Sequence, residues 1–279
     1  MYKSRLSHGA SVMTDSMILN LAALAALLPA ALVPYRRDSQ RPDQLFWATA
    51  AVAIAGPVVA SVSHLQGSWQ TGFSTNLWIS VAATMSMFVI ASVLMRQASR
   101  LAPLLLPYLL LLGVLATVWS KAPGQAGLTS PPDGWLAAHI VASVATYGLA
   151  TLAAVAGVAV LLQERAMKRK RPTALTHKLP SVSDASILQV RLLGAAAAVL
   201  TVGIVTGVAE EYLSTGQLLA FNHKILLTFL TLAVIVVLLV LHQRTGLRGQ
   251  RAARLILLAY LLLTLAYPGV KFVTDVLLA

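Results

Sequence analysis

The sequence contains no cysteine and few charged residues. Without cysteine, the chain can form no disulfide, no thiolate metal site and no Cys-x-x-Cys redox pair. Only 11% of its 279 residues are charged and 58% are hydrophobic, whereas a soluble domain normally has about 25% charged residues. These proportions exclude a soluble globular protein and indicate an integral membrane protein.

Motifs that mark many enzymes and driven carriers are also missing. The chain has no phosphate-binding glycine-rich loop, no G-x-S-x-G nucleophile turn and no H-E-x-x-H zinc motif. Its apolar stretches hold almost no acidic residue, and no internal repeat is visible. Both absences disfavour an ion-coupled transporter. We therefore expect a binding protein that catalyses no reaction alone.

Eight long apolar stretches are present, and each could cross a bilayer as a helix of about 20 residues. They are continuous and rich in leucine and alanine rather than alternating, which excludes a transmembrane β-barrel. The sequence predicts an all-α polytopic transmembrane helix bundle, with a tail at 1–15 and one transmembrane domain over 16–279. The predicted spans are 17–35, 45–63, 77–95, 101–119, 136–163, 188–208, 223–242 and 254–277.

Basic residues gather in alternate connections between these spans. Most of the 21 lysines and arginines follow the first, third, fifth and seventh spans. The positive-inside rule makes these connections cytoplasmic and places both termini outside. The net charge of +12 therefore reflects orientation and does not suggest nucleic acid. The run Arg165–Arg171 is best explained as an orientation signal, with an anionic-lipid contact as the alternative.

Three histidines lie at predicted outer ends of spans, namely His64, His139 and His223. An imidazole at a span end can ligate iron or titrate near neutral pH. Each could also be a tolerated interfacial residue, although three on one face make that interpretation weaker. The remaining histidines fall in the tail and on the cytoplasmic side: His8, His177 and His242.

The fifth predicted span has a stripe of small and polar residues at helical spacing. Such a stripe allows another helix, or a flat ligand, to approach the backbone closely. For its lower half, ordinary helix packing is an equally good explanation. Gly203 and Gly207 of the sixth span are interpreted as packing glycines. The stripe consists of His139, Ser143, Tyr147, Ala150, Ala154 and Gly157.

Aromatic and basic side chains accompany the histidines on the predicted outer side. An aromatic belt explains most of the tryptophans there, with a shallow ligand pocket as the alternative. Lys224 and Lys271 lie near outer span ends, where either could meet a ligand carboxylate. Lys271 could instead pair with Asp275 at i,i+4 spacing or reach the lipid headgroups. The tryptophans concerned are Trp69, Trp78, Trp119 and Trp135.

These residue types suit haem, which needs axial ligands, apolar walls and cations for its propionates. We predict a non-covalent b-type haem with His139 and His223 as the axial ligands of the iron. His64 is a weaker candidate or a donor to one of those ligands. Lys224 and Lys271 are predicted to lie near the propionates.

An ordered set of segments carries a family resemblance: HIVASVATYGLATLAAVAGVAVLLQER, LPSV, HKILLTFLTLAVIVVLLVLHQR, GLRGQRAA and LAYPGVKFV. The set resembles the cytochrome c assembly family of CcsA/HemX-like membrane proteins, and within it the short eight-span inner-membrane members of the YpjD type. The resemblance runs over most of residues 60–279 and is firmest at 139–165 and 223–273.

The resemblance implies haem handling at the outer face of a bacterial inner membrane, for attachment to apocytochrome c. His139 matches the histidine that opens the family's HxxxSxxxYxxL helix, His223 the HK position of the short members, and His242 the family's LHxR. The implied partners are haem, other cytochrome c maturation proteins or apocytochrome c, and membrane lipid.

One departure from the family pattern keeps other functions open. Full haem-handling members have a tryptophan-rich outer loop ending in WDPKE, whereas the corresponding EEYLSTGQLLAFNHK has no tryptophan. This difference favours the alternative of a cofactor-free membrane scaffold that stabilises a partner complex. A small-solute transporter is a third class. An absorbance spectrum of the purified protein separates haem binding from the other two.

Overall fold

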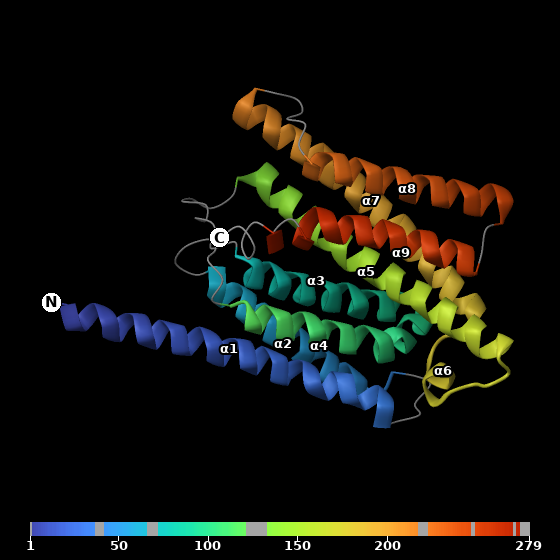
Figure 1. Cartoon of the computed structure of the whole chain (residues 1–279), viewed down its shortest axis with the longest axis horizontal. Helices are drawn as coiled ribbons and strands as arrows, with labels where there is room; N and C mark the ends of the chain where they lie inside the picture. Colours follow the sequence, from blue (N-terminus) through green and yellow to red (C-terminus); the bar gives the residue numbers. More distant parts are fainter. Residues whose placement is uncertain are drawn as a thin grey trace.

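The computed structural model describes residues 2–36, 42–65, 72–120, 133–216, 223–246, 249–269 and 272–273. Every regular element among these residues is a helix, and seven of the helices are long and apolar enough to cross a membrane. The prediction of an all-α transmembrane bundle is therefore confirmed. The long helices lie side by side in a bundle (Figure 1), and the protein is an integral membrane protein.

The N-terminal half of the bundle is built around two antiparallel pairs of helices. The first pair packs very closely, because a Cβ at Gly56 would lie 2.6 Å from the Cβ of Ala26. A 3₁₀ helix leads from the third helix into the fourth. The elements are α1 (Tyr2–Arg36), α2 (Gln44–Leu65), α3 (Phe73–Leu94), η1 (Arg96–Leu101) and α4 (Ala102–Val118).

The C-terminal half has α5 at its centre. This helix is the most deeply buried of the seven, and it packs along α7 and against α3 and α9. Its buried face is rich in alanine and glycine, so neighbouring backbones can approach closely. The elements are α5 (Gly134–Lys168), α6 (Ala174–Lys178), α7 (Val182–Thr215), α8 (His223–Thr245), α9 (Gln250–Thr264) and the π-helix η2 (Leu265–Gly269).

Several helices extend beyond the predicted spans. The helices α5 and α7 continue past the predicted limits 136–163 and 188–208 into charged residues, because backbone hydrogen bonding does not stop where the apolar core ends. The predicted tail 1–15 falls almost entirely within α1. The predicted eighth span begins as α9, a helix of 15 residues, and continues as the five-residue η2.

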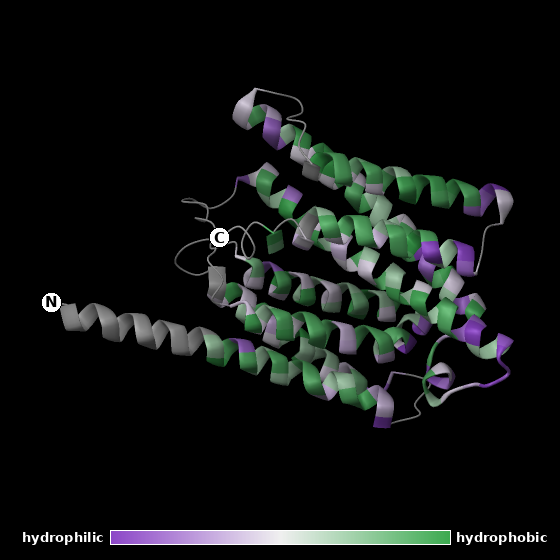
Figure 2. Cartoon of the chain, in the orientation of Figure 1, coloured by the Kyte–Doolittle hydropathy of each residue, from purple (hydrophilic) through white to green (hydrophobic). Residues whose placement is uncertain are grey.

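The two ends of the bundle differ in charge. The ends of α1 and α8 and the connection between α5 and α7 lie at the same end, on the right in Figures 1 and 2. We call this the basic end, and we call the opposite end, where α5 begins and α7 finishes, the histidine end. The predicted alternation thus brings the basic connections together, and which membrane face they occupy stays a prediction. Basic residues described there are Arg36, Arg96, Arg100, Arg165, Lys168, Arg169, Lys170, Arg171, Lys178, Arg244 and Arg251.

The connection between α5 and α7 ties the two halves together at the basic end. Lys178 Nζ donates to the carbonyl oxygens of Pro34 and Tyr35, at 2.9 and 3.0 Å, and so satisfies the last turn of α1. Arg100 donates to the carbonyl oxygens of Lys178 and His177, at 3.3 and 3.1 Å. These hydrogen bonds join α1, η1 and α6.

Candidate functional site

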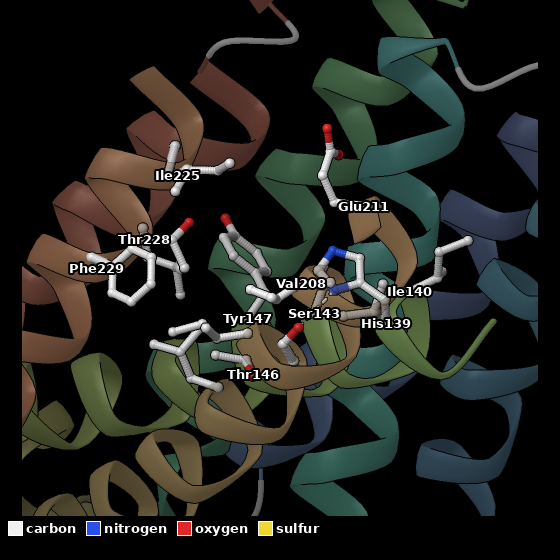
Figure 3. Close-up of a pocket in the computed structure, with 17 residues that line it drawn as sticks. His139, Ile140, Ser143, Thr146, Tyr147, Val208, Glu211, Ile225, Thr228 and Phe229 are labelled. Atoms are coloured by element: carbon white, nitrogen blue, oxygen red, sulfur yellow. Dashed lines mark hydrogen bonds between the residues drawn. The ribbon is translucent and has the colours of Figure 1, made fainter. Parts of the chain in front are cut away.

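A cavity of about 390 Å³ lies between α5, α7, α8 and the junction of α9 with η2. Its volume falls within the range of about 300–1,000 Å³ that is typical of small-molecule sites. In Figure 3, side chains of α8 lie on one side of Tyr147, and His139 and Ser143 lie on the other. Most of the lining is apolar, and α5 and α7 contribute the largest share. The lining residues are His139, Ile140, Ser143, Val144, Thr146, Tyr147, Leu200, Gly203, Ile204, Gly207, Val208, Glu211, Ile225, Thr228, Phe229, Leu263 and Ala266.

His139 is held in one orientation by α7. Its Nδ1 lies 2.8 Å from the carbonyl oxygen of Gly203. A carbonyl oxygen only accepts, so Nδ1 must carry the proton of this bond, and in the neutral ring Nε2 is then an acceptor. The nearest partner of Nε2 is the hydroxyl of Ser143, at 3.5 Å, which is too long for a strong bond. Many metal-binding histidines are oriented in this way by a backbone carbonyl, which fixes one ring nitrogen and leaves the other as the possible ligand; ligation by His139 stays a prediction.

Gly207 makes room for this imidazole. A Cβ at position 207 would lie 2.8 Å from both Cε1 and Nδ1 of His139, closer than a side chain can normally approach. Gly203, by contrast, would place its Cβ in ordinary contact with Ala142, at 3.5 Å. Gly203 is thus a packing glycine, as predicted from the sequence, whereas the close neighbour of Gly207 is the ring of His139.

The predicted stripe on α5 divides into two parts. Its upper half, His139, Ser143 and Tyr147, lines the cavity. Its lower half is buried against other helices, and Gly157 faces the side chain of Gln189 and the backbone of Ala253. Helix packing is therefore confirmed for the lower half, and the approach of a flat ligand to the upper half stays a prediction.

Three tyrosine hydroxyls meet around Tyr147, which lines the cavity. Tyr108 of α4 lies 2.5 Å from Tyr260 of α9 and 3.4 Å from Tyr147 of α5. Tyr260 in turn lies 3.2 Å from Tyr147, and Thr151 donates to Tyr260 at 3.2 Å. Sequence reasoning missed this cluster. A single tyrosine within a leucine-rich span was the available signal, because its buried hydroxyl needs a hydrogen-bond partner.

Thr146 supplies a second polar group beside Tyr147. Its side chain is 1% exposed and lines the cavity, and its hydroxyl has no hydrogen-bond partner among the described residues. A buried hydroxyl without a partner is unfavourable by about 1–3 kcal/mol. A ligand with an acceptor at this position would relieve that cost.

Acidic residues lie at the histidine end of the cavity, on one side of its mouth. Glu211 lines the mouth, and the neighbouring Glu210 interacts with Asp133 and with His139. Asp133 also caps α5 by accepting from the backbone nitrogen of Leu136, at 2.8 Å. No lysine or arginine is among the cavity residues of the described chain. Sequence reasoning passed over this rim, which the paired glutamates at the end of the sixth predicted span could have indicated.

The other predicted ligands fall mostly outside the described side chains. His223 and Lys224 form the start of α8, just before Ile225 and Thr228 of the cavity wall, but their side chains lie outside the described part. The same holds for the side chain of His64, in the last turn of α2.

Lys271 and Asp275 also lie outside the described residues, so their predicted roles are open. The described tryptophans do not line the cavity. Trp78 is fully buried, and Trp119 packs edge-on against Phe73 and Phe272. His177 and His242 lie at the basic end.

Comparison with known proteins identifies the family. The family model described as "Cytochrome C assembly protein" matches residues 44–278. A protein of Azospirillum brasilense, described as an uncharacterized 28.8 kDa protein in the nifR3-like 5' region, is 50% identical over 270 residues, covering 95% of this chain and all of the relative. No solved structure matches. Since the family model covers most of the chain, and includes the helices that build the cavity, this protein belongs to the cytochrome c assembly family.

Proposed function

We propose that this protein supports cytochrome c biogenesis by binding haem without a covalent bond in the cavity beside His139, at the outer face of a bacterial inner membrane. The observation that carries the proposal is the hydrogen bond from His139 Nδ1 to the carbonyl oxygen of Gly203, because in the neutral ring it leaves Nε2 as an acceptor on a side chain that lines a mostly apolar cavity. Bound haem would supply an iron centre to be ligated and a porphyrin for attachment to an apocytochrome.

The residues present fit this ligand in three respects. His139 offers an axial nitrogen, and the walls from Leu200, Ile204 and Leu263 are apolar, as a porphyrin ring requires. Position 207 has no side chain to displace the imidazole. His223 is the proposed second axial ligand, since α8 begins there and its next turn forms the opposite wall.

The acidic rim constrains how the propionates would lie. Carboxylates directed at Glu211 would meet a like charge in a partly desolvated mouth, which is unfavourable. The propionates are therefore proposed to point toward α8 and η2, where Lys224 and Lys271 occur in the sequence. This orientation keeps the two predicted cations in their predicted role.

Haem binding is tested by absorbance of the detergent-purified protein. We expect a Soret band with α and β bands on reduction, and His139→Ala should lose or shift them while membrane levels stay normal. His177→Ala is the control, because that side chain lies at the basic end and should leave the spectrum unchanged. A spectrum that both variants leave intact would contradict the assignment of His139.

The second candidate is a scaffold that binds no cofactor and stabilises a partner complex. It is favoured by the absence of tryptophan from EEYLSTGQLLAFNHK and by the acidic rim beside His139. Under this proposal the purified protein has no Soret band, and His139→Ala lowers recovery of a partner complex instead. In neither case does the chain catalyse a reaction alone.

A further inference from the structure

The wall of the cavity that α8 contributes is thin at Phe229. This side chain lines the cavity and is 41% exposed. Its neighbours Leu226 and Leu230 are exposed as well. In a membrane the exposed side chains of α8 contact lipid, so Phe229 lies at the boundary between the cavity and the acyl chains.

The part of α8 that covers the cavity is also the less firmly packed part. The buried side chains of α8 are Thr231, Ile235 and Leu238, all of them nearer the basic end. Between Ile225 and Leu230 no side chain is buried. Contacts therefore anchor the helix below the cavity, and displacement of the segment beside the cavity loses little buried apolar surface.

The alternative route leads through the mouth at the histidine end. A haem arriving there would bring two carboxylates past Glu211 and the neighbouring pair of Glu210 and Asp133. Like charges repel one another at short range, so these carboxylates oppose the entry of a second pair of carboxylates through the mouth. The lipid side presents no such charge, because Phe229 and its exposed neighbours are apolar.

We propose that the ligand reaches the cavity from the lipid, through the α8 wall at Phe229, and not through the acidic mouth. The inference rests on the proposed function, since it takes haem as the ligand. It assigns Phe229 as the side chain that must move aside, and it assigns the bilayer as the source from which the protein takes an apolar, planar molecule.

The test measures the rates of haem transfer from haem-loaded vesicles to proteoliposomes that contain the protein, by stopped-flow absorbance at the Soret band. Phe229→Ala should raise the association and dissociation rates together, several-fold each, because a smaller side chain at this position lowers the barrier to passage in both directions. The ratio of the two rates, and so Kd, should change much less. Phe229→Trp enlarges this side chain and should slow both rates.

Leu230→Ala is the matched control. Leu230 is the next residue of α8 and is 46% exposed, but it does not line the cavity. Its truncation should leave both rates at the wild-type values, whereas a general loosening of α8 would make it behave like Phe229→Ala. Equal acceleration of haem transfer in the two alanine variants therefore overturns the assignment of Phe229 as the side chain that must move aside.

The outcomes also separate the route from the function. Wild-type protein that takes up haem, with rates that neither Phe229 variant alters, overturns the lipid route alone. If Glu210→Gln raises the rates of haem transfer and Phe229→Ala leaves them unchanged, haem enters through the acidic mouth, and the lipid route is overturned as well. Wild-type protein that takes up no haem at all overturns the proposed function, and with it this inference.

Discussion

Gly207 determines how closely α7 can approach the imidazole on α5. Its missing side chain and the carbonyl oxygen of Gly203 act on the same ring from one helix face. One glycine prevents a clash, and the other provides an acceptor. The position of the Nε2 atom of His139 is therefore a property of the pair of helices and not of His139 alone.

Gly207→Ala is expected to weaken haem binding. The new Cβ would lie 2.8 Å from the ring of His139, so the ring must turn away and its bond to Gly203 must lengthen. Loss of such a supporting contact typically lowers metal affinity about 10- to 100-fold. Haem titration measures the change. Gly194→Ala on the same helix is the control, because a Cβ there meets nothing within 4 Å. Equal losses of haem affinity in the two variants would contradict the role of Gly207 in making room for the imidazole.

The tyrosine cluster is expected to stabilise the fold. Tyr260→Phe removes the hydroxyl that meets Tyr108, Tyr147 and Thr151, and it leaves buried polar groups with fewer partners. The free energy of unfolding should fall by about 1–3 kcal/mol, which thermal denaturation in detergent can detect. Tyr212→Phe, at a position that is 53% exposed, should have almost no effect. Equal stability of the Tyr260 variant and wild type would argue against the cluster.

At the level of elements, the connection between α5 and α7 forms hydrogen bonds that hold the end of the α1–α2 pair. Lys178 reaches the last carbonyl groups of α1, and Gln163 of α5 donates to the carbonyl oxygens of Thr176 and Pro180 at 2.8 and 3.0 Å. The α1–α2 pair is otherwise largely exposed within the described residues. The pair also packs against α3 and α4, so the polar contacts at the basic end add to this packing and hold the last turn of α1.

Lys178→Met is expected to loosen this hairpin. The substitution keeps an unbranched chain but removes the donor to Pro34 and Tyr35. Hydrogen exchange in the last turn of α1 should become faster, while exchange within α5 stays slow because that helix is deeply buried. Lys168→Met, at an exposed position of the same basic segment, serves as the control. Unchanged hydrogen exchange in α1 would show that the hydrogen bonds of Lys178 to α1 are dispensable.

The sequence predicts helices better than it predicts where they meet. Apolar length is a local property, so the spans and the stripe from His139 to Tyr147 could be predicted from composition and spacing. The contact of Gly207 with His139, and the meeting of Tyr108 with Tyr260, join positions far apart in the chain. Such contacts depend on which helices become neighbours, and no local pattern contains that information.

For the whole molecule, the gathering of basic connections at one end predicts the orientation. The loop that contains Arg165–Arg171 should be cytoplasmic and both termini should be outside. A reporter that is active only in the cytoplasm should work when fused after Lys170 and stay silent when fused after Ala279. The reverse pattern would move the His139 cavity to the opposite face, where the proposed function no longer applies.

The separation of charge between the two ends gives the molecule an electric dipole along the bundle axis. Among the side chains that the structure describes, arginines and lysines gather at the basic end, and Asp133, Glu210 and Glu211 lie at the histidine end. In a membrane with a negative interior, each elementary charge carried across the full potential changes the energy by about 2.3 kcal/mol per 100 mV. The predicted orientation places this dipole along the field, so an energised membrane would help to hold the inserted chain and would oppose any motion that carries the rim carboxylates inward.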